Sequence, residues 1–355
     1  MTSILQINIG VCRAAQDLAM ATANAKAIDL LVISEQYRDK DENDGWYADA
    51  SGRAAVAVLG RHQLDTIGPR LPGFRWIEMN GFRLYSCHCS PNVPFTEFET
   101  FLRRLESSVR EALCPVIVAG DFNSKSQEWG SPREDARGKA LADLTASLGL
   151  TTCNRGNAPI FVRGASESHL DLTFASNSAA SQVRDWNVLD EESLSLHKYI
   201  GYTIGATRKQ HLKPTHNGWA FRKLDRVKLK ESLTQVVDVT NQEPKEACNT
   251  TIRWLTKACD ASMPKSGDNK RRPVPWWNPD IAEQRKKCLR SRRAYTRKRK
   301  KTDTAGCAVE LETFRHERKT LSAMILAAKE ENWRRKIGKA FASLWTAIPG
   351  ATRTK

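Results

Sequence analysis

The stretch 115-PVIVAGDFNSKSQEW-129 decides how the rest of the chain is interpreted. Its apolar, β-branched run, Val116–Ala119, is typical of a fully buried strand. We expect Gly120 to let the backbone turn sharply and so deliver Asp121 and Asn123 to the rim of a sheet. A carboxylate and a carboxamide there can hold a water molecule or a metal ion, although Asp and Asn in turns commonly bond only to their own backbone. Polar residues at other strand ends favour the functional interpretation.

Hydrophobic periodicity predicts an α/β protein. Strands are expected at 4–9, 29–34, 54–59, 82–89, 116–119, 170–175, 183–188 and 199–204. Helices are expected at 13–27, 94–113 and 137–148, and the apolar stripe of the second helix is interpreted as core packing. Strands that alternate with a few helices over residues 1–205 favour an α/β sandwich over a repeat or a barrel.

Six polar side chains stand at the ends of these strands. They are Asn8, Glu35, Asp121, Asn123, Asp171 and His197. Each alone has a structural explanation, such as a cap, a surface carboxylate or a packed imidazole. Together, and without clustered Cys or His, they favour a hard cation such as Mg²⁺ or Mn²⁺. A hard cation beside carboxylates and one histidine suits the hydrolysis of a phosphate ester.

The positive charge of the chain is concentrated in its second part. The formal net charge is +16, with 20 Lys and Arg against 25 Asp and Glu in residues 1–205 (net −5) and 36 against 15 in residues 206–355 (net +21). Such an excess favours a polyanionic partner, and nucleic acid is the usual one. The sequence therefore predicts DNA as a partner, and RNA as a further one for the basic part.

Residues 206–355 are expected to form a basic, mostly helical region with linkers. Helices are predicted at 224–237, 247–263, 278–301 and 311–328. Aromatic residues between the cations are expected to stack on bases, although a solvated charged face is the plainer alternative. They are Trp276, Trp277, Tyr295 and Trp333. The run 297-RKRKK-301 is a candidate nuclear localisation signal, which predicts a nuclear protein, cytoplasmic before import.

Cysteine usage and hydropathy limit the class of protein further. The nine cysteines are an odd number and include no CxxC pair, so we expect reduced thiols in the cytosol or nucleus and no zinc knuckle. The start, MTSILQINIG, lacks the features of a signal peptide, and no apolar run approaches the length of a membrane span.

These residues carry a family resemblance. The chain resembles the exonuclease–endonuclease–phosphatase family through QIN at 6–8, SEQ at 34–36, GDFN at 120–123, SxxD at 168–171 and a remnant of a final SDH motif at 195–197. Within that family it most resembles the apurinic-type endonuclease domains of LINE-type (non-LTR), jockey-like retrotransposons. The supporting motifs are SPN at 90–92, WGSP at 129–132 and PWWNP at 275–279. The resemblance covers residues 3–205.

The resemblance implies a fold, a domain division and a history. The fold would be a two-sheet α/β sandwich over residues 1–205, followed by a helical connector over residues 206–355. In such elements the connector precedes a reverse transcriptase. This chain has no Tyr-x-Asp-Asp sequence, so we expect a copy that is truncated before the polymerase.

The resemblance also implies roles for the polar residues. Glu35 would be the main metal ligand, with Asn8 beside it. Asp121 would position or deprotonate the attacking water, and Asn123 would hold the phosphate and Asp121. Asp171 would orient His197, which would contact the scissile phosphate. The resemblance places three further residues at the phosphate or the DNA: His88, Asn92 and Ser168.

Two positions depart from the family pattern. Leu196 stands where the family has Asp directly before the final His, so we expect weaker metal binding and weakened activity. His88 stands where a Tyr usually contacts the phosphate, and it can still donate a hydrogen bond.

Three functions are compatible with these observations. The first is a metal-dependent DNA endonuclease that nicks one strand of a retrotransposition target and leaves a 3′ hydroxyl. The second is a nucleic-acid-binding remnant that Leu196 has inactivated. The third is a phosphatase or phosphodiesterase for a small or lipid phosphate, which the basic second part disfavours.

Overall fold

The computed structural model describes residues 1–39, 41–60, 62–164, 166–205, 219, 224–234, 237–240, 242–264, 274–301 and 306–346. The chain divides into two compact units. The first comprises Met1–Thr207 with Pro273–Lys355, and the second comprises Arg208–Arg272.

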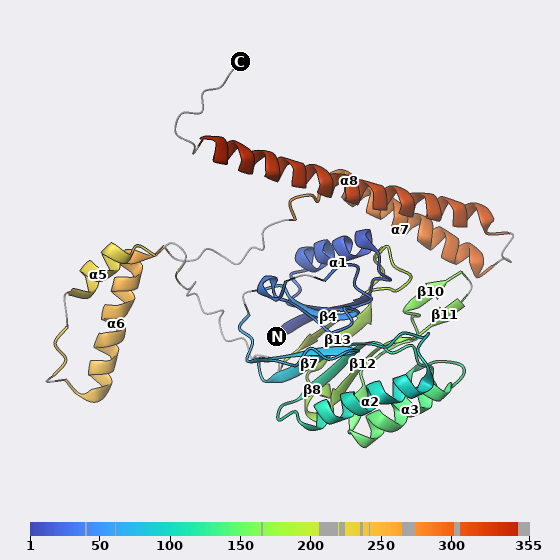
Figure 1. Cartoon of the computed structure of the whole chain (residues 1–355), viewed down its shortest axis with the longest axis horizontal. Coiled ribbons are helices and arrows are strands. Elements are labelled where there is room, and N and C mark those ends of the chain that lie inside the picture. Colours follow the sequence, from blue (N-terminus) through green and yellow to red (C-terminus); the bar gives the residue numbers. More distant parts are fainter. Residues whose placement is uncertain are drawn as a thin grey trace, which may run out of the picture. The chain divides into compact units, whose positions relative to one another are not determined.

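Two six-stranded mixed sheets form the centre of the first unit (Figure 1). The first sheet has the order β13-β14-β1-β2-β4-β3, with β13 Val183–Val188, β14 Ile200–Ile204, β1 Thr2–Asn8, β2 Leu30–Ser34, β4 Ala54–Val58 and β3 Trp46–Ala48. The second has the order β5-β6-β7-β8-β12-β9, with β5 Thr66–Ile67, β6 Phe74–Met79, β7 Phe82–His88, β8 Val116–Asp121, β12 Asp171–Ser176 and β9 Leu150–Thr152. A separate hairpin joins β10 Phe161–Arg163 to β11 Ser166–Ser168.

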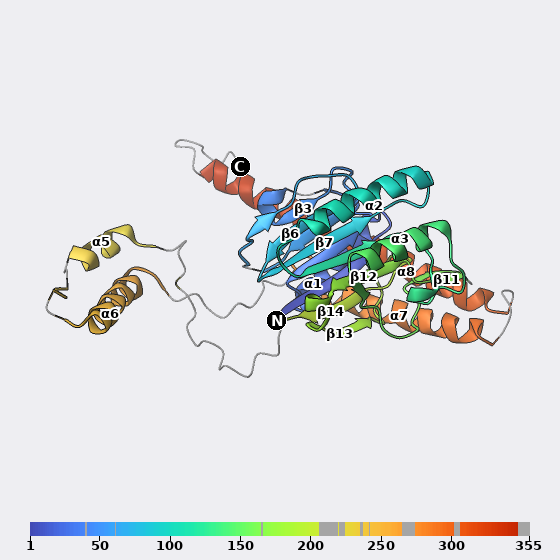
Figure 2. The ribbon, with the colours of Figure 1, turned by 90° about the horizontal axis from the view of Figure 1, so that it is seen from below.

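Helices cover the outer face of each sheet (Figures 1 and 2). The first sheet is covered by α1 Arg13–Ala25, α7 Pro279–Arg299 and α8 Ala308–Thr346, and the second by α2 Phe95–Arg110 and α3 Ala136–Ser147. Short helices lie at Glu42–Asp44, Gln127–Trp129 and α4 Asn177–Ala180. A third apolar cluster, including Ile4, Val32 and Ile117, fills the space between the sheets. The predicted two-sheet α/β sandwich followed by a mostly helical region is confirmed.

The strand that the sequence placed at the centre continues through Gly120. We expected a sharp turn there, but β8 extends to Asp121. Gly120 has a φ of 155°, and a Cβ atom on it would lie 1.9 Å from the carbonyl oxygen of Cys87 on the neighbouring strand. The glycine is therefore required by the close approach of two strands rather than by a turn.

The helices α7 and α8 lie side by side as a hairpin and pack on the sandwich (Figure 1). Ile281 and Cys288 of α7, with Leu321 and Ile325 of α8, join the apolar cluster under α1. Their apolar faces explain why these basic helices belong to the same compact unit as residues 1–207. The domain boundary after residue 205 stays a prediction, and the linker residues 206–218 and 271–273 lie outside the described residues.

The second unit is a pair of helices, α5 Arg226–Thr234 and α6 Pro244–Ser262. The backbone N–H of Asp225, just before α5, donates to the carbonyl oxygen of Ser262, the last residue of α6. This bond joins the start of one helix to the end of the other.

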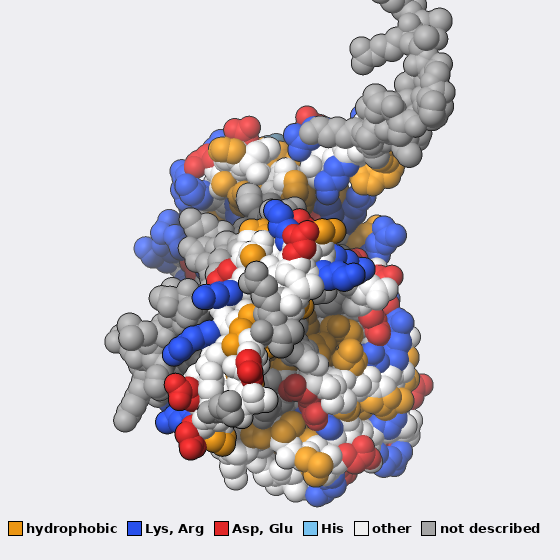
Figure 3. All heavy atoms as spheres, turned by 90° about the vertical axis from the view of Figure 1, so that its left-hand side faces the viewer, with side chains coloured by type: hydrophobic (Ala, Val, Ile, Leu, Met, Phe, Trp, Pro, Cys, Tyr) orange, Lys and Arg blue, Asp and Glu red, His pale blue; other side chains and the backbone are white. Residues whose placement is uncertain are grey.

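The surface carries both signs of charge. On the face that Figure 3 shows, Lys and Arg side chains are interspersed with Asp and Glu, so no block of one sign covers it. The nine cysteines form no disulfide bonds with one another. Among the described helices, none combines the length and the apolar character that crossing a membrane requires.

Candidate active site

The sheet topology brings the predicted polar residues to one end of the sandwich. β1 and β2 are parallel, so Asn8 at the end of β1 lies opposite Ser34, and Glu35 follows. In the second sheet His88 ends β7 opposite Asp121 at the end of the parallel strand β8. Asp171 begins the antiparallel strand β12 opposite the same Asp121. Residues from five separate stretches of sequence therefore meet at a single edge.

Buried hydrogen bonds join the two sheets near this edge. The side-chain amide of Gln6 donates to the carbonyl oxygen of Leu172 at 3.1 Å, and its oxygen accepts from the hydroxyl of Thr173 at 2.9 Å. The hydroxyl of Ser34 donates to the carbonyl oxygen of Cys87 at 3.1 Å and accepts from the backbone N–H of Asp121 at 3.3 Å. These bonds determine how the strand ends of one sheet lie against those of the other.

His197 lies between two buried carboxylates. Its Nδ1 is 2.6 Å from Oδ2 of Asp171, and its Nε2 is 4.0 Å from Oδ2 of Asp121. The ring of Phe161 packs against the imidazole with centroids 4.9 Å apart. The segment before His197 is joined to β1, because the hydroxyl of Ser195 donates to the carbonyl oxygen of Asn8 at 2.7 Å. The histidine is therefore fixed in orientation by Asp171 and by neighbouring backbone contacts.

Burial and neighbouring charges shift the pKa values of both Asp121 and His197. Burial and the negative charge of Asp171 raise the pKa of Asp121 to about 6. Burial alone would lower the pKa of His197, but Asp171, Asp121 and Glu35 raise it to about 9. At pH 7 the carboxylate of Asp121 is therefore mostly ionised and can take up a proton, whereas His197 is an imidazolium.

Asn8 orients the carboxylate of Asp121. Its side-chain N–H donates to Oδ2 of Asp121 at 2.7 Å, and its oxygen accepts from the backbone N–H of Gly10 at 2.8 Å. The second lone pair of that oxygen is left for another donor or for a cation.

Glu35 pairs with His88. The ring Nε2 of His88 lies 3.2 Å from Oε1 of Glu35, and this hydrogen bond lowers the pKa of the carboxyl group. Glu35 also adopts a φ of 49°, a left-handed conformation that costs about 1–2 kcal/mol for a residue with a side chain. Asn123 and Leu194, at φ 48° and 58°, share this conformation around the same cavity. Strained backbone of this kind often accompanies functional sites.

A cavity of about 360 Å³ lies over these residues and has Asn8, Glu35, Asp121, Asn123 and His197 among its walls. Two further residues line it. Leu196, which is 42 % exposed, is the residue that was identified from the sequence as a departure from the family pattern. Arg318 comes from α8 and was not predicted from the sequence as a site residue. No local motif marks Arg318, because only the packing of α8 against the sandwich brings it here.

The remaining predicted residues, Asn123, Asn92 and Ser168, differ in how closely they contact Asp121 and His197. The backbone N–H of Asn123 holds Oδ1 of Asp121 at 3.0 Å, while its side chain donates to the carbonyl oxygen of Cys89. Asn92 is exposed on its turn, and its backbone N–H bonds to the hydroxyl of Ser90. Ser168 lies in β11 opposite Phe161, so it supports the strand that contacts His197 through backbone pairing. The roles assigned to all these residues stay predictions.

The described residues offer oxygen donors for a hard cation. Asp121, Asp171 and His197 have ligand atoms within 4.8 Å of one another, a spacing compatible with a metal ion. However, Nδ1 of His197 is already engaged with Asp171, which makes this triad better suited to proton transfer. Glu35 is 28 % exposed at the side chain and has a lowered pKa, so it presents an ionised carboxylate to the cavity. The donor set is compatible with Mg²⁺ or Mn²⁺.

Part of the chain is similar to a known protein family. Residues 82–201 match the model of the family described as endonuclease-reverse transcriptase. This part of the chain is similar to that family. The resemblance inferred from the sequence motifs is thus confirmed over these residues. No curated protein matches the chain.

Many solved structures are similar to part of this chain, and the following three are among them. The endonuclease domain of TRAS1, a telomere-specific non-LTR retrotransposon, is 26% identical, with 59% of this chain and 100% of that chain covered and a TM-score of 0.49. An AP endonuclease from Archaeoglobus fulgidus is 14% identical, with 58% and 100% covered and a TM-score of 0.48. The 3′ phosphatase NExo from Neisseria, bound to a product DNA hairpin, is 16% identical, with 58% and 100% covered and a TM-score of 0.46.

Proposed function

We propose that this protein is a divalent-metal-dependent endonuclease that hydrolyses a phosphodiester bond in DNA. The nick would leave a 3′ hydroxyl that can prime reverse transcription at a retrotransposition target. The observation that carries the proposal is the placement of His197 between Asp171, at 2.6 Å, and Asp121, at 4.0 Å, beside a cavity that Glu35 also lines.

The geometry supports a division of labour among these groups. Asp121, with a pKa of about 6, takes the proton of a water whose oxygen attacks phosphorus. The bond from phosphorus to the 3′ oxygen breaks, and that oxygen takes up a proton from solvent. His197, with a pKa of about 9, remains an imidazolium and stabilises the negative charge on the phosphate oxygens.

Glu35 and Asn8 are the residues that would hold the metal ion. A bound Mg²⁺ or Mn²⁺ supplies Lewis-acid polarisation of the phosphoryl oxygen. Glu35 is ionised and only partly exposed, which suits a carboxylate that pairs with a cation.

Nicking of supercoiled plasmid tests the proposal. Wild-type protein should convert supercoiled to open-circular DNA in Mg²⁺ or Mn²⁺ and not in EDTA, and a polymerase should extend the nick directly because it ends in a 3′ hydroxyl. Asp121→Asn should abolish nicking with little change in unfolding, since Asn keeps the shape of the side chain. Nicking by Asp121→Asn at the wild-type rate would refute the assignment.

Leu196 favours a second candidate, an inactive nucleic-acid-binding remnant. This apolar side chain is 42 % exposed and lines the cavity where a carboxylate would add negative charge for a cation. DNA binding that persists in EDTA, with no cleavage in any divalent metal, would establish the remnant.

We also propose that the protein acts in the nucleus. The basic run 297–301 lies at the end of α7, and all its residues except Arg299 are exposed, so an import receptor could reach them. A fluorescent fusion that stays nuclear when Lys298, Arg299 and Lys300 are replaced by Gln would contradict this role for the run.

A further inference from the structure

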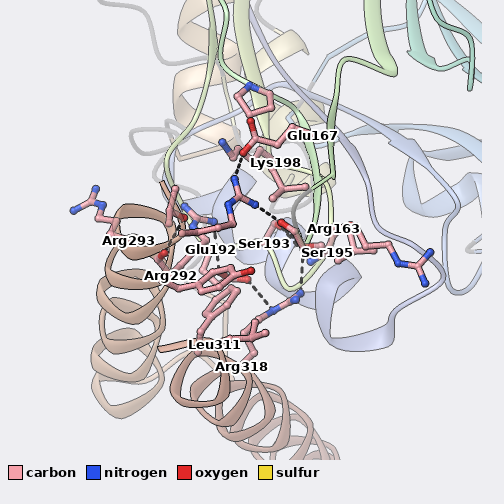
Figure 4. Close-up of a pocket in the computed structure, with 18 of the residues that line it drawn as sticks. Arg163, Glu167, Glu192, Ser193, Ser195, Lys198, Arg292, Arg293, Leu311 and Arg318 are labelled. Carbon is pink, nitrogen blue, oxygen red and sulfur yellow. Dashed lines mark hydrogen bonds and ion pairs between the residues drawn. The ribbon is translucent and has the colours of Figure 1, made fainter. Parts of the chain in front are cut away.

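A second and larger cavity adjoins the active site. Its volume is about 550 Å³, and it lies between the β10–β11 hairpin, the segment 190–198 and the α7–α8 hairpin (Figure 4). It shares four residues with the active-site cavity, namely Ser195, Leu196, His197 and Arg318. The two cavities therefore adjoin, and one ligand can extend from the first cavity into the second.

Positive charge predominates in this second cavity. Nine Lys or Arg side chains line it, against three Asp or Glu side chains. The three carboxylates are already engaged: Glu167 with Arg299, Asp190 with Arg292 and Arg293, and Glu192 with Arg292 and Arg318. The cavity therefore has cations that its own carboxylates do not neutralise.

Lys198 is the cation best placed to meet a substrate. It follows His197 directly, and no ion pair joins it to a described residue. Burial and the neighbouring charge of Arg292 lower the pKa of its ammonium group, which means that the site disfavours the charge in the absence of an anion. Arg163, on the edge strand β10, is exposed and likewise has no ion pair with any residue in the described ranges.

Aromatic rings hold two other cations in position. Tyr295 of α7 and Phe314 of α8 are stacked, with centroids 6.4 Å apart and an interplanar angle of 17°. The guanidinium of Arg299 lies 5.9 Å from the Tyr295 ring, and that of Arg318 lies 5.6 Å from the Phe314 ring. Arg318 also donates to the carbonyl oxygen of Ser195 at 3.2 Å. These contacts keep the arginines extended along the cavity wall rather than free in solvent.

We propose that this cavity binds the sugar–phosphate backbone of the substrate DNA strand next to the scissile phosphate, with Lys198 and Arg163 as phosphate contacts. The inference rests on the proposed function and extends it, because it makes the basic α7–α8 hairpin part of the substrate site. The volume lies in the range of roughly 300–1,000 Å³ that is usual for pockets holding small-molecule-sized groups. A nucleotide is such a group, and the surplus of cations selects for its phosphate.

DNA binding by the full chain in EDTA, measured by fluorescence anisotropy over a range of salt concentrations, tests the proposal without cleavage. Loss of one phosphate contact should lower the slope of log K against log salt by about 0.9, which corresponds to roughly eightfold weaker binding at 0.1 M salt. Lys198→Gln and Arg163→Gln should each show this loss, and Lys198→Arg should restore binding because it keeps the charge. Lys287→Gln is the matched control, since Lys287 is exposed on α7 and does not line the cavity.

The outcomes separate this inference from the proposed function. Equal binding by Lys198→Gln, Arg163→Gln and Lys287→Gln would overturn the subsite, even if wild-type protein nicks plasmid normally. Selective weakening of the two cavity variants with an unchanged control would support it. Wild-type protein that binds DNA with the expected cavity dependence but nicks nothing in any metal would refute the nuclease and leave the subsite standing.

Discussion

The imidazole of His197 and the carboxylate of Asp171 lie 2.6 Å apart at Nδ1 and Oδ2, and both side chains are buried. The pair directs Nε2 of the ring toward Asp121. Because the second oxygen of Asp171 has no hydrogen-bond partner in the described structure, His197 is its main polar contact. We therefore propose that Asp171 acts through His197 rather than on the substrate.

Replacement of that carboxylate tests its positioning role. Asp171→Asn keeps the shape of the side chain but removes the charge that stabilises the imidazolium. We expect nicking to fall about 10²- to 10⁴-fold with little change in DNA affinity. Single-turnover nicking and anisotropy on the same samples measure the two quantities. Equal losses of binding and nicking would contradict a role confined to the chemical step.

The raised pKa of His197 predicts that stability and nicking activity both fall at alkaline pH. The folded pKa of about 9 exceeds the ordinary value of 6.5, so the charged ring contributes stability fully below pH 6.5 and loses that contribution as the pH rises through 9. Nicking should fall over the same upper range, because the neutral ring no longer offsets phosphate charge. In Asp171→Asn the fall should occur at lower pH. A pH profile that is unchanged by this substitution would count against His197 as the titrating group.

Removal of the Glu35 carboxylate should change the metal requirement. Glu35→Gln keeps an oxygen that can accept from His88 but removes the negative charge. We expect a higher Mg²⁺ concentration for half-maximal nicking, by about tenfold or more, since a hard cation prefers a carboxylate. Metal titrations of nicking measure this, with Glu97→Gln on the exposed start of α2 as the control. An unchanged requirement would remove Glu35 from the metal site.

Introduction of a carboxylate at position 196 should strengthen the active site. Leu196 is exposed in the cavity, so Leu196→Asp adds a negative charge beside His197 without displacing core packing. We expect faster nicking at limiting Mg²⁺ or Mn²⁺ than in the wild type. If the substitution gains nothing, the weakened metal binding assigned to Leu196 is wrong.

The buried carboxylate of Glu192 should contribute strongly to stability. It is 2 % exposed, and it pairs with Arg292 of α7 at 3.4 Å and with Arg318 of α8 at 3.3 Å. Glu192→Ala leaves both arginines without this partner and should lower the free energy of unfolding by about 3 kcal/mol. Urea denaturation measures the change, and Glu312→Ala, at an exposed pair with Arg315, should cost less than about 0.5 kcal/mol. A similar cost for both variants would show that Glu192 does not anchor the helices.

Sequence periodicity predicted the long central strands and most helices within a few residues. It did not predict the short strands, and α8 continues 18 residues past the predicted end at residue 328. The sequence missed β3, β5, β9, β10 and β11, which have two or three residues each, and also the longer β6. Short strands lack enough residues to show alternation, and partners distant in the chain stabilise them.

The aromatic residues of the basic region illustrate a second limit of prediction from sequence. Trp276 and Trp277 are partly buried against the core and Tyr295 packs on Phe314, whereas Trp333 is 64 % exposed, so of these four residues Trp333 has the most ring surface left for base stacking.

By itself the sequence determined the fold class, the endonuclease resemblance and the polar residues at the strand ends, because strand periodicity and motif spacing are local properties of the chain. Only the tertiary structure decided that Glu35 pairs with His88 and that Arg318 of α8 enters the active-site cavity. Residues 318 and 197 are far apart in sequence, and it is burial of the apolar face of α8 against α1 that brings them to the same cavity. Contacts of that kind depend on how whole elements pack, which no local pattern encodes.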